Sequence, residues 1–231
     1  MELQTKPNLI IWDIDGTLTY YCTVRYHYKD VLIELGIEPK EEYVDEILMT
    51  IAKFLEMATI EHCFSQDYFS KYNETHLYFL RDSGISGTEF SNKGKELQPK
   101  YLLSHIGMYR LLDFIYERTE ITQVAFSNWF LDVQEEKLRS FGLLPFISKI
   151  YTPETIFAKP STEGFNSILE AEGIEPKKAI MIGDSAEDLG ASGAGIPTIL
   201  IDHFGDKQDL YSQAGEVART PNDIKELILK K

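Results

Sequence analysis

Residues 10–17 read IIWDIDGT, an apolar run that ends in two acids and a glycine. Its apolar residues are typical of a buried strand, and two acids, Asp13 and Asp15, stand at the end of that strand. Side chains alternate faces along a strand, so both carboxyl groups are expected on the same side. Two like charges at such short range repel unless a positive group lies near them or one of them holds a proton. Gly16 then permits a tight backbone turn.

Further short apolar runs indicate a parallel sheet. Strands are predicted at residues 8–13, 122–127, 147–152, 178–184 and 196–202, with helices at 131–142, 162–173 and 221–231. Alternating strands and helices favour a sheet covered on both faces. The predicted fold class is therefore α/β, with a Rossmann-like parallel sheet as its core.

The interval between the first two predicted strands has a different pattern. Helices are expected at 23–36, at 43–58, where apolar residues recur every four positions, and at 67–82. Residues 82–99 are rich in Gly, Ser and Asn, so a loop or hinge is expected there. These patterns predict an α/β core domain from residues 1–17 and 99–231, and an inserted all-helical domain at 18–98.

Composition excludes several classes of protein. The 231 residues carry a net charge of −14, which argues against a nucleic-acid partner. No apolar signal segment or membrane-spanning run is present, so we expect a cytoplasmic protein with no membrane partner. The two cysteines form no metal or disulfide pattern. The oligomeric state is unknown from the sequence.

Four short motifs fall at or just beyond the ends of predicted strands, where ligands bind in open α/β sheets. They are DIDGT (13–17), Ser127–Asn128, Lys159–Pro160 and GDSAED (183–188). Each alone has a structural explanation: an Asp-Gly turn, a helix cap, an exposed lysine, or a capping box between Ser185 and Asp188. Their order and common location favour a functional site.

In this order the motifs resemble those of the haloacid dehalogenase-like (HAD) hydrolase superfamily. The helical insert resembles the cap of its helical-cap phosphatase branch, which includes phosphoglycolate phosphatase-like proteins. The resemblance implies that the Asp13 carboxylate attacks phosphorus and that Asp15 serves as general acid and base. It also implies that Lys159 neutralises charge, and that Ser127, Asn128 and Lys159 bind the phosphate.

The resemblance further implies a Mg²⁺ cofactor. Between unit charges about 4 Å apart, repulsion costs on the order of 4 kcal/mol at an effective dielectric of 20, so a phosphate needs a cation here. The implied ligands are the Asp13 carboxylate, the backbone carbonyl of Asp15 and the Asp184 carboxylate. Asp188 is expected to orient a metal-bound water or Lys159.

The predicted function is Mg²⁺-dependent hydrolysis of a small phosphorylated metabolite through an aspartyl phosphate on Asp13. A phosphotransferase such as a sugar-phosphate mutase would use the same residues. A dehalogenase would not need Asp15, and a non-catalytic binding protein would not need the nucleophile. The aromatic stretch after the first motif is expected to pack the insert's first helix. In an alternative interpretation Tyr20, Arg25 or His27 contacts the leaving group.

Overall fold

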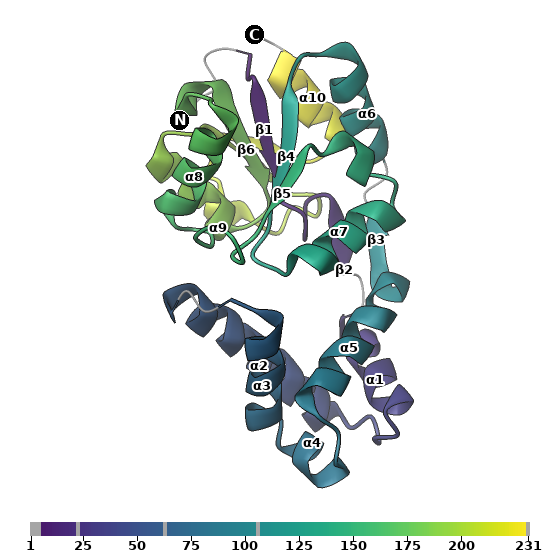
Figure 1. Cartoon of the computed structure of the whole chain (residues 1–231). Helices are drawn as coiled ribbons and strands as arrows, with labels where there is room; N and C mark the ends of the chain where they lie inside the picture. The colour runs from purple at the N-terminus through teal and green to yellow at the C-terminus, as the bar shows by residue number, and fades with distance from the viewer. Residues whose placement is uncertain (1–5, 22–23, 62–63, 105–106, 230–231) are drawn as a thin grey trace. The chain divides into compact units, whose positions relative to one another are not determined.

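The computed structural model describes residues 6–21, 24–61, 64–104 and 107–229 (Figure 1). The chain divides into two compact units, one of Met1–Tyr20 with Ser104–Lys231 and the other of Tyr21–Leu103. Two short strands, β2 (Thr19–Tyr21) and β3 (Leu102–Ser104), pair with each other where the chain passes between the units.

The first unit is built on a six-stranded sheet in which every neighbouring pair of strands is parallel. The spatial order is β5-β4-β1-β6-β7-β8. The strands are β1 (Leu9–Trp12), β4 (Thr122–Phe126), β5 (Lys149–Tyr151), β6 (Ala179–Gly183), β7 (Thr198–Ile201) and β8 (Glu216–Ala218). The predicted α/β class and five of these strands are confirmed. The edge strand β8 was not predicted, because three residues give no readable alternation.

Alternating residues of the strands pack against helices on opposite faces of the sheet (Figure 1). Ile10 and Trp12 join the core beneath α6 (Met108–Arg118), α7 (Leu131–Ser140) and α10 (Pro221–Leu229). Leu9 and Ile11 join the core beneath α8 (Thr162–Glu172). All four side chains are fully buried, as expected for a central parallel strand.

The strand register brings the predicted motifs to one edge of the sheet. Trp12 lies opposite Ala125 of β4 and Ile182 of β6. The residues that follow these positions therefore leave the sheet together at its carboxyl edge, the usual ligand edge of such sheets. A short helix, α9 (Ala186–Leu189), begins just after β6 there. The described residues also form short 3₁₀ helices, which are η1 (Gln98–Tyr101), η2 (Leu144–Phe146), η3 (Pro176–Lys178), η4 (Gly190–Ala194) and η5 (Gln208–Leu210).

The second unit is helical and has a hydrophobic core of its own. Its helices are α1 (Val24–Glu34), α2 (Glu41–Glu61), α3 (Gln66–His76), α4 (Tyr78–Ser83) and α5 (Gly87–Leu97). Val31, Val44, Leu80 and Phe90 are among the buried residues that join α1, α2, α4 and α5. Among the described residues, no helix is both long enough and apolar enough to cross a membrane.

Two predictions for this unit are wrong. Residues 87–97 form helix α5 rather than a loop, because their small residues permit close helix packing instead of a turn. A Cβ atom on Gly87 would lie only 1.9 Å from the carbonyl oxygen of Ser70 in α3. The side chain of Ser86 caps the helix by accepting a hydrogen bond from the backbone N–H of Glu89. The helix expected at 67–82 is instead two helices, interrupted at Leu77, whose backbone is extended.

Candidate active site

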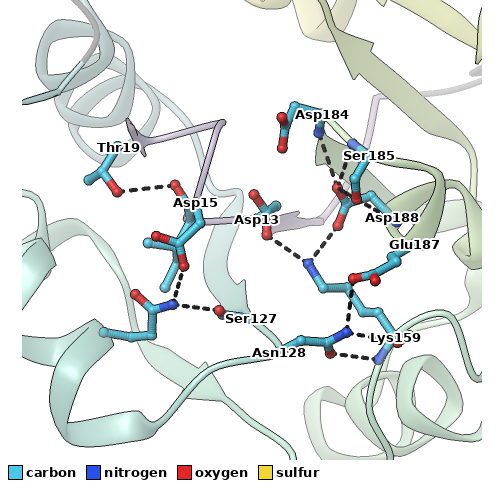
Figure 2. Close-up of polar contacts among 12 residues, drawn as sticks. Asp13, Asp15, Thr19, Ser127, Asn128, Lys159, Asp184, Ser185, Glu187 and Asp188 are labelled. Carbon is cyan, nitrogen blue, oxygen red and sulfur yellow. Dashed lines mark hydrogen bonds and ion pairs between the residues drawn. The ribbon is translucent and has the colours of Figure 1, made fainter. Parts of the chain in front are cut away.

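Asp13 lies at the carboxyl end of β1, and its side chain is buried. Its Oδ1 accepts a hydrogen bond of 2.7 Å from Nζ of Lys159 (Figure 2). Its Oδ2 is also buried and has no hydrogen-bond partner among the described residues. A buried oxygen of this kind is costly unless a ligand contacts it, so Oδ2 marks a position for an incoming electrophile or cation.

The Asn128 side chain forms hydrogen bonds with both the backbone N–H and the backbone carbonyl of Lys159. Its Oδ1 accepts from the Lys159 backbone N–H at 2.8 Å, and its Nδ2 donates to the Lys159 carbonyl at 2.8 Å. Nδ2 also donates to Glu187 at 3.0 Å (Figure 2). The side-chain amide of Asn128 therefore fixes Lys159 in place. Because that amide is occupied, the backbone N–H of Asn128 is the group left for the predicted phosphate contact.

Asp188 holds the other side of Lys159. Its Oδ1 accepts from Lys159 Nζ at 2.6 Å, so the buried ammonium group lies between Asp13 and Asp188 (Figure 2). Its Oδ2 accepts from the backbone N–H groups of Asp184 and Ser185 and from the Ser185 hydroxyl. The capping box is therefore present and serves the site as well, because it orients the lysine's second partner.

Asp15 lies on the other side of Asp13, and helix α7 supplies its partners. Lys137 Nζ donates to Oδ1 at 2.6 Å and Gln134 Nε2 donates to Oδ2 at 2.5 Å. The same Gln134 nitrogen lies 2.6 Å from Oγ of Ser127. Ser127 accepts that bond and keeps its hydroxyl hydrogen for a further acceptor. Gln134 and Lys137 were not predicted from the sequence.

Asp184 follows β6 and contacts a cation that was also missed. Lys207 Nζ lies 2.6 Å from its Oδ2. The loop that carries Lys207 is organised by buried Asp202, which accepts from the backbone N–H groups of Gly205 and Asp206. The positive charge of Lys207 offsets part of the acidity at this edge of the sheet.

Gly16 is the residue that lets these acids approach each other. Its φ of +95° is a conformation that side-chain-bearing residues rarely adopt. A Cβ atom here would lie 2.3 Å from Oδ2 of Asp184. Glycine is therefore required on both conformational and steric grounds.

The electrostatics of the cluster follow from burial. Burial, together with Asp188, Asp184 and Asp15, raises the pKa of Asp13 well above its usual value, although Lys159 opposes the rise. Burial also raises the pKa of Asp184, against the effect of Lys207. Burial by itself would lower the pKa of Lys159, but Asp13 and Asp188 outweigh it and raise that pKa. The site is short of positive charge.

The donor set suits a hard divalent cation. Carboxylate oxygens of Asp13, Asp184 and Asp188 lie within 4.8 Å of one another. Both oxygens of Asp188 already accept hydrogen bonds, whereas Oδ2 of Asp13 does not. Asp13 and Asp184 are thus the side chains suited to ligation, and Asp188 is suited to orientation.

The residues considered for leaving-group contact belong to different units of the chain. Arg25 is ion-paired with Glu41 and Asp45 within the helical unit. His27 is buried in that unit, and its Nε2 lies 2.8 Å from the carbonyl oxygen of Gly94. Tyr20 belongs to the sheet unit, where its ring packs edge-on against His203.

The missed residues differ in how visible they were. Gln134 and Lys137 are three positions apart, which places them on one helix face, and both are buried. A face holding Val133 and Leu138 beside Gln134 and Lys137 was the available signal. Lys207 gave no signal, because only the path of its loop brings it to Asp184.

Comparisons with known proteins identify the class. The family model for haloacid dehalogenase-like hydrolases matches residues 7–194. That match covers most of the chain and includes all four motifs, so the chain belongs to this family. No curated protein matches the sequence.

Solved structures share the fold at low sequence identity. The HAD-hydrolase YfnB from Bacillus subtilis, bound to magnesium, has a TM-score of 0.73 at 19% identity, with 97% of this chain and 100% of that chain covered. A 2-haloacid dehalogenase from Pseudomonas syringae pv. Tomato DC3000 has a TM-score of 0.71 at 18% identity, covering 97% and 99%. A predicted phosphoglycolate phosphatase from Haemophilus somnus 129pt has a TM-score of 0.69 at 15% identity, also covering 97% and 99%. The shared fold thus accompanies different named activities.

Proposed function

We propose that the protein is a Mg²⁺-dependent phosphatase that hydrolyses a small phosphomonoester through an aspartyl phosphate on Asp13. The main observation behind this proposal is that the two oxygens of Asp13 have different environments. Oδ1 is held by Lys159 at 2.7 Å, while Oδ2 is buried and has no partner among the described residues. A carboxylate fixed by one oxygen presents the other as a nucleophile or a metal ligand.

Asp15 supports phosphoryl chemistry over dehalogenation. Cleavage of a phosphate ester releases an alkoxide, which needs a proton, whereas a halide needs none. The Asp15 side chain is 39% exposed, so a substrate oxygen can reach it, and its two oxygens are held by Gln134 and Lys137. The proposed roles are Asp15 as acid and base, and Ser127, the Asn128 backbone N–H and Lys159 as phosphate ligands.

Mg²⁺ is the proposed cofactor, held by Asp13, the backbone carbonyl of Asp15 and Asp184. When bound, it would neutralise charge between the acids and the phosphate. Support comes from the grouped carboxylates and from the raised pKa values of Asp13 and Asp184, since burial leaves both acids poorly compensated.

The helical unit, residues 21–103, is proposed as the cap that selects the leaving group. It has its own core and is joined to the sheet unit through two chain crossings, as a movable cap requires.

The same site could pass the phosphoryl group to a sugar hydroxyl instead of water. Adding hexose phosphates to a trapped phosphoenzyme tests that route. Faster loss of the phosphoryl group from the enzyme, with its transfer to the sugar, identifies a phosphotransferase.

The experiment is a phosphometabolite screen with Mg²⁺, repeated with EDTA and with the Asp13→Asn variant. We expect phosphate release from at least one small phosphomonoester, and loss of that release with EDTA or in the variant. Release that persists in Asp13→Asn, or chloride release from a 2-haloacid without any phosphatase activity, contradicts the proposal.

A further inference from the structure

We propose that Gln134 and Lys137 are positioning residues, which hold the Asp15 carboxylate in the orientation that proton transfer requires. The inference rests on the proposed function. Lys137 Nζ lies 2.6 Å from Oδ1 of Asp15, and Gln134 Nε2 lies 2.5 Å from Oδ2. Each carboxylate oxygen therefore has its own donor, and the side chain is held against rotation.

The burial of these donors is hard to explain by stability alone. Gln134 is 0% exposed and Lys137 is 3% exposed, although both lie on a helix that packs against the sheet. Burying an amide and an ammonium group is costly, and leucine or methionine would pack there without that cost. The contacts to Asp15 give these two polar residues a reason to occupy the inner face of α7.

Gln134 also connects two parts of the proposed chemistry. Its Nε2 contacts Oδ2 of Asp15 and lies 2.6 Å from Oγ of Ser127, so the two amide hydrogens are shared between acid–base and phosphate-binding residues. Its Oε1 is buried and has no hydrogen-bond partner among the described residues.

Proton transfer enters the two chemical steps differently. In the first step, an Asp13 oxygen bonds to phosphorus while the bond to the leaving oxygen breaks, and Asp15 gives that oxygen a proton. In the second step, a water oxygen bonds to phosphorus while the Asp13–phosphorus bond breaks, and the Asp15 carboxylate takes the water's proton. A nitrophenolate leaving group needs no proton, so with p-nitrophenyl phosphate only the second step depends on Asp15.

The test measures both steps in Lys137→Met and Gln134→Leu. Nitrophenol release in a single turnover, with Mg²⁺ present and enzyme in excess over substrate, reports the first step, and the nitrophenol burst with substrate in excess counts active sites. Steady-state turnover reports the second. We expect the single-turnover rate to stay within about threefold of wild type and steady-state kcat to fall about 10- to 100-fold. Asp15→Asn is the reference variant, because it should show the same contrast between an unchanged single-turnover rate and a reduced steady-state kcat.

Arg139→Met is the matched control, because Arg139 is on the exposed face of α7 and pairs with Glu135 and Glu136. It should leave both rates unchanged. Equal losses in the two rates, or turnover within twofold of wild type in both variants, would overturn the inference while leaving the proposed function intact. A wild-type protein that transfers no phosphoryl group overturns the proposed function, and this inference with it.

Discussion

Lys159 and Asp13 form a buried ion pair, with Nζ 2.7 Å from Oδ1, although they are 146 positions apart in sequence. The same ammonium group lies 2.6 Å from Asp188. One lysine therefore compensates two buried carboxylates. The stability of the sheet edge and the chemistry proposed for it depend on the same charge.

Replacing Lys159 with methionine should destabilise the protein. The variant leaves Asp13 and Asp188 buried without their cation, and breaking a buried pair in this way costs about 3–5 kcal/mol. Urea unfolding in EDTA measures the free energy of unfolding. Lys71→Met is the control, since Lys71 forms an exposed pair with Asp67 and should change that free energy by less than about 1 kcal/mol. Equal effects of the two variants would contradict the prediction.

The raised pKa of Asp13 predicts how stability changes with pH. The folded protein keeps a proton that the unfolded chain releases near pH 3.9, so stability falls as pH rises from that value through the folded-state pKa. Asp13→Asn removes this contribution. In EDTA, the free energy of unfolding of the variant relative to wild type should therefore increase from pH 4 to pH 7. A difference that does not change with pH would show that Asp13 titrates normally.

Lys207 should compete with a divalent cation for Asp184. Its Nζ lies 2.6 Å from Oδ2 of Asp184, and both side chains are partly exposed. Lys207→Met removes that competitor, so the Mg²⁺ concentration for half-maximal binding should fall by roughly threefold to fivefold. This is the change expected when an ion pair worth about 1 kcal/mol is lost. Calorimetric Mg²⁺ titration measures the change. Weaker binding in the variant would instead indicate that Lys207 supports the metal site.

Gly16→Ala should disable the site. The added Cβ would lie 2.3 Å from Asp184 Oδ2 at a φ of +95°, so Asp15 and Asp184 must shift. We expect kcat to fall about 100-fold, the scale of a 1 Å misplacement. Gly36→Ala is the matched control, because Gly36 also has positive φ (+73°) but no heavy atom lies within 4 Å of the added Cβ. That variant should lose about 1 kcal/mol of stability and no activity. Equal activity losses would exclude the steric explanation.

The sheet could be predicted because its central strands are continuous apolar runs. β1 and β6 are buried on both faces, so their sequences differ clearly from the helices around them. Helix α5 could not be predicted this way, since Gly87 and Ser91 are typical of loops until a packed neighbour such as Ser70 is known. Its small residues reflect tertiary contact, which local pattern does not contain.

The candidate site was visible to the extent that its residues follow strands. Asp13, Ser127 and Asp184 each follow a recognisable strand, and the parallel register brings them to one edge. Lys137 was missed although it shares a helix face with apolar residues, because a lysine within a helix is usually solvent-exposed. Its burial beside Asp15 depends on where α7 packs, which is a property of the folded chain.

The proposed mechanism requires that a phosphoryl group becomes covalently attached to Asp13. Borohydride reduction of an acid-quenched reaction converts an acyl phosphate on aspartate into homoserine, which peptide mass spectrometry locates. We expect homoserine at position 13 in the presence of Mg²⁺ and substrate, and unmodified aspartate there when substrate is omitted. Phosphate release with aspartate unmodified at position 13, or with the reduced residue at any other position, would contradict it.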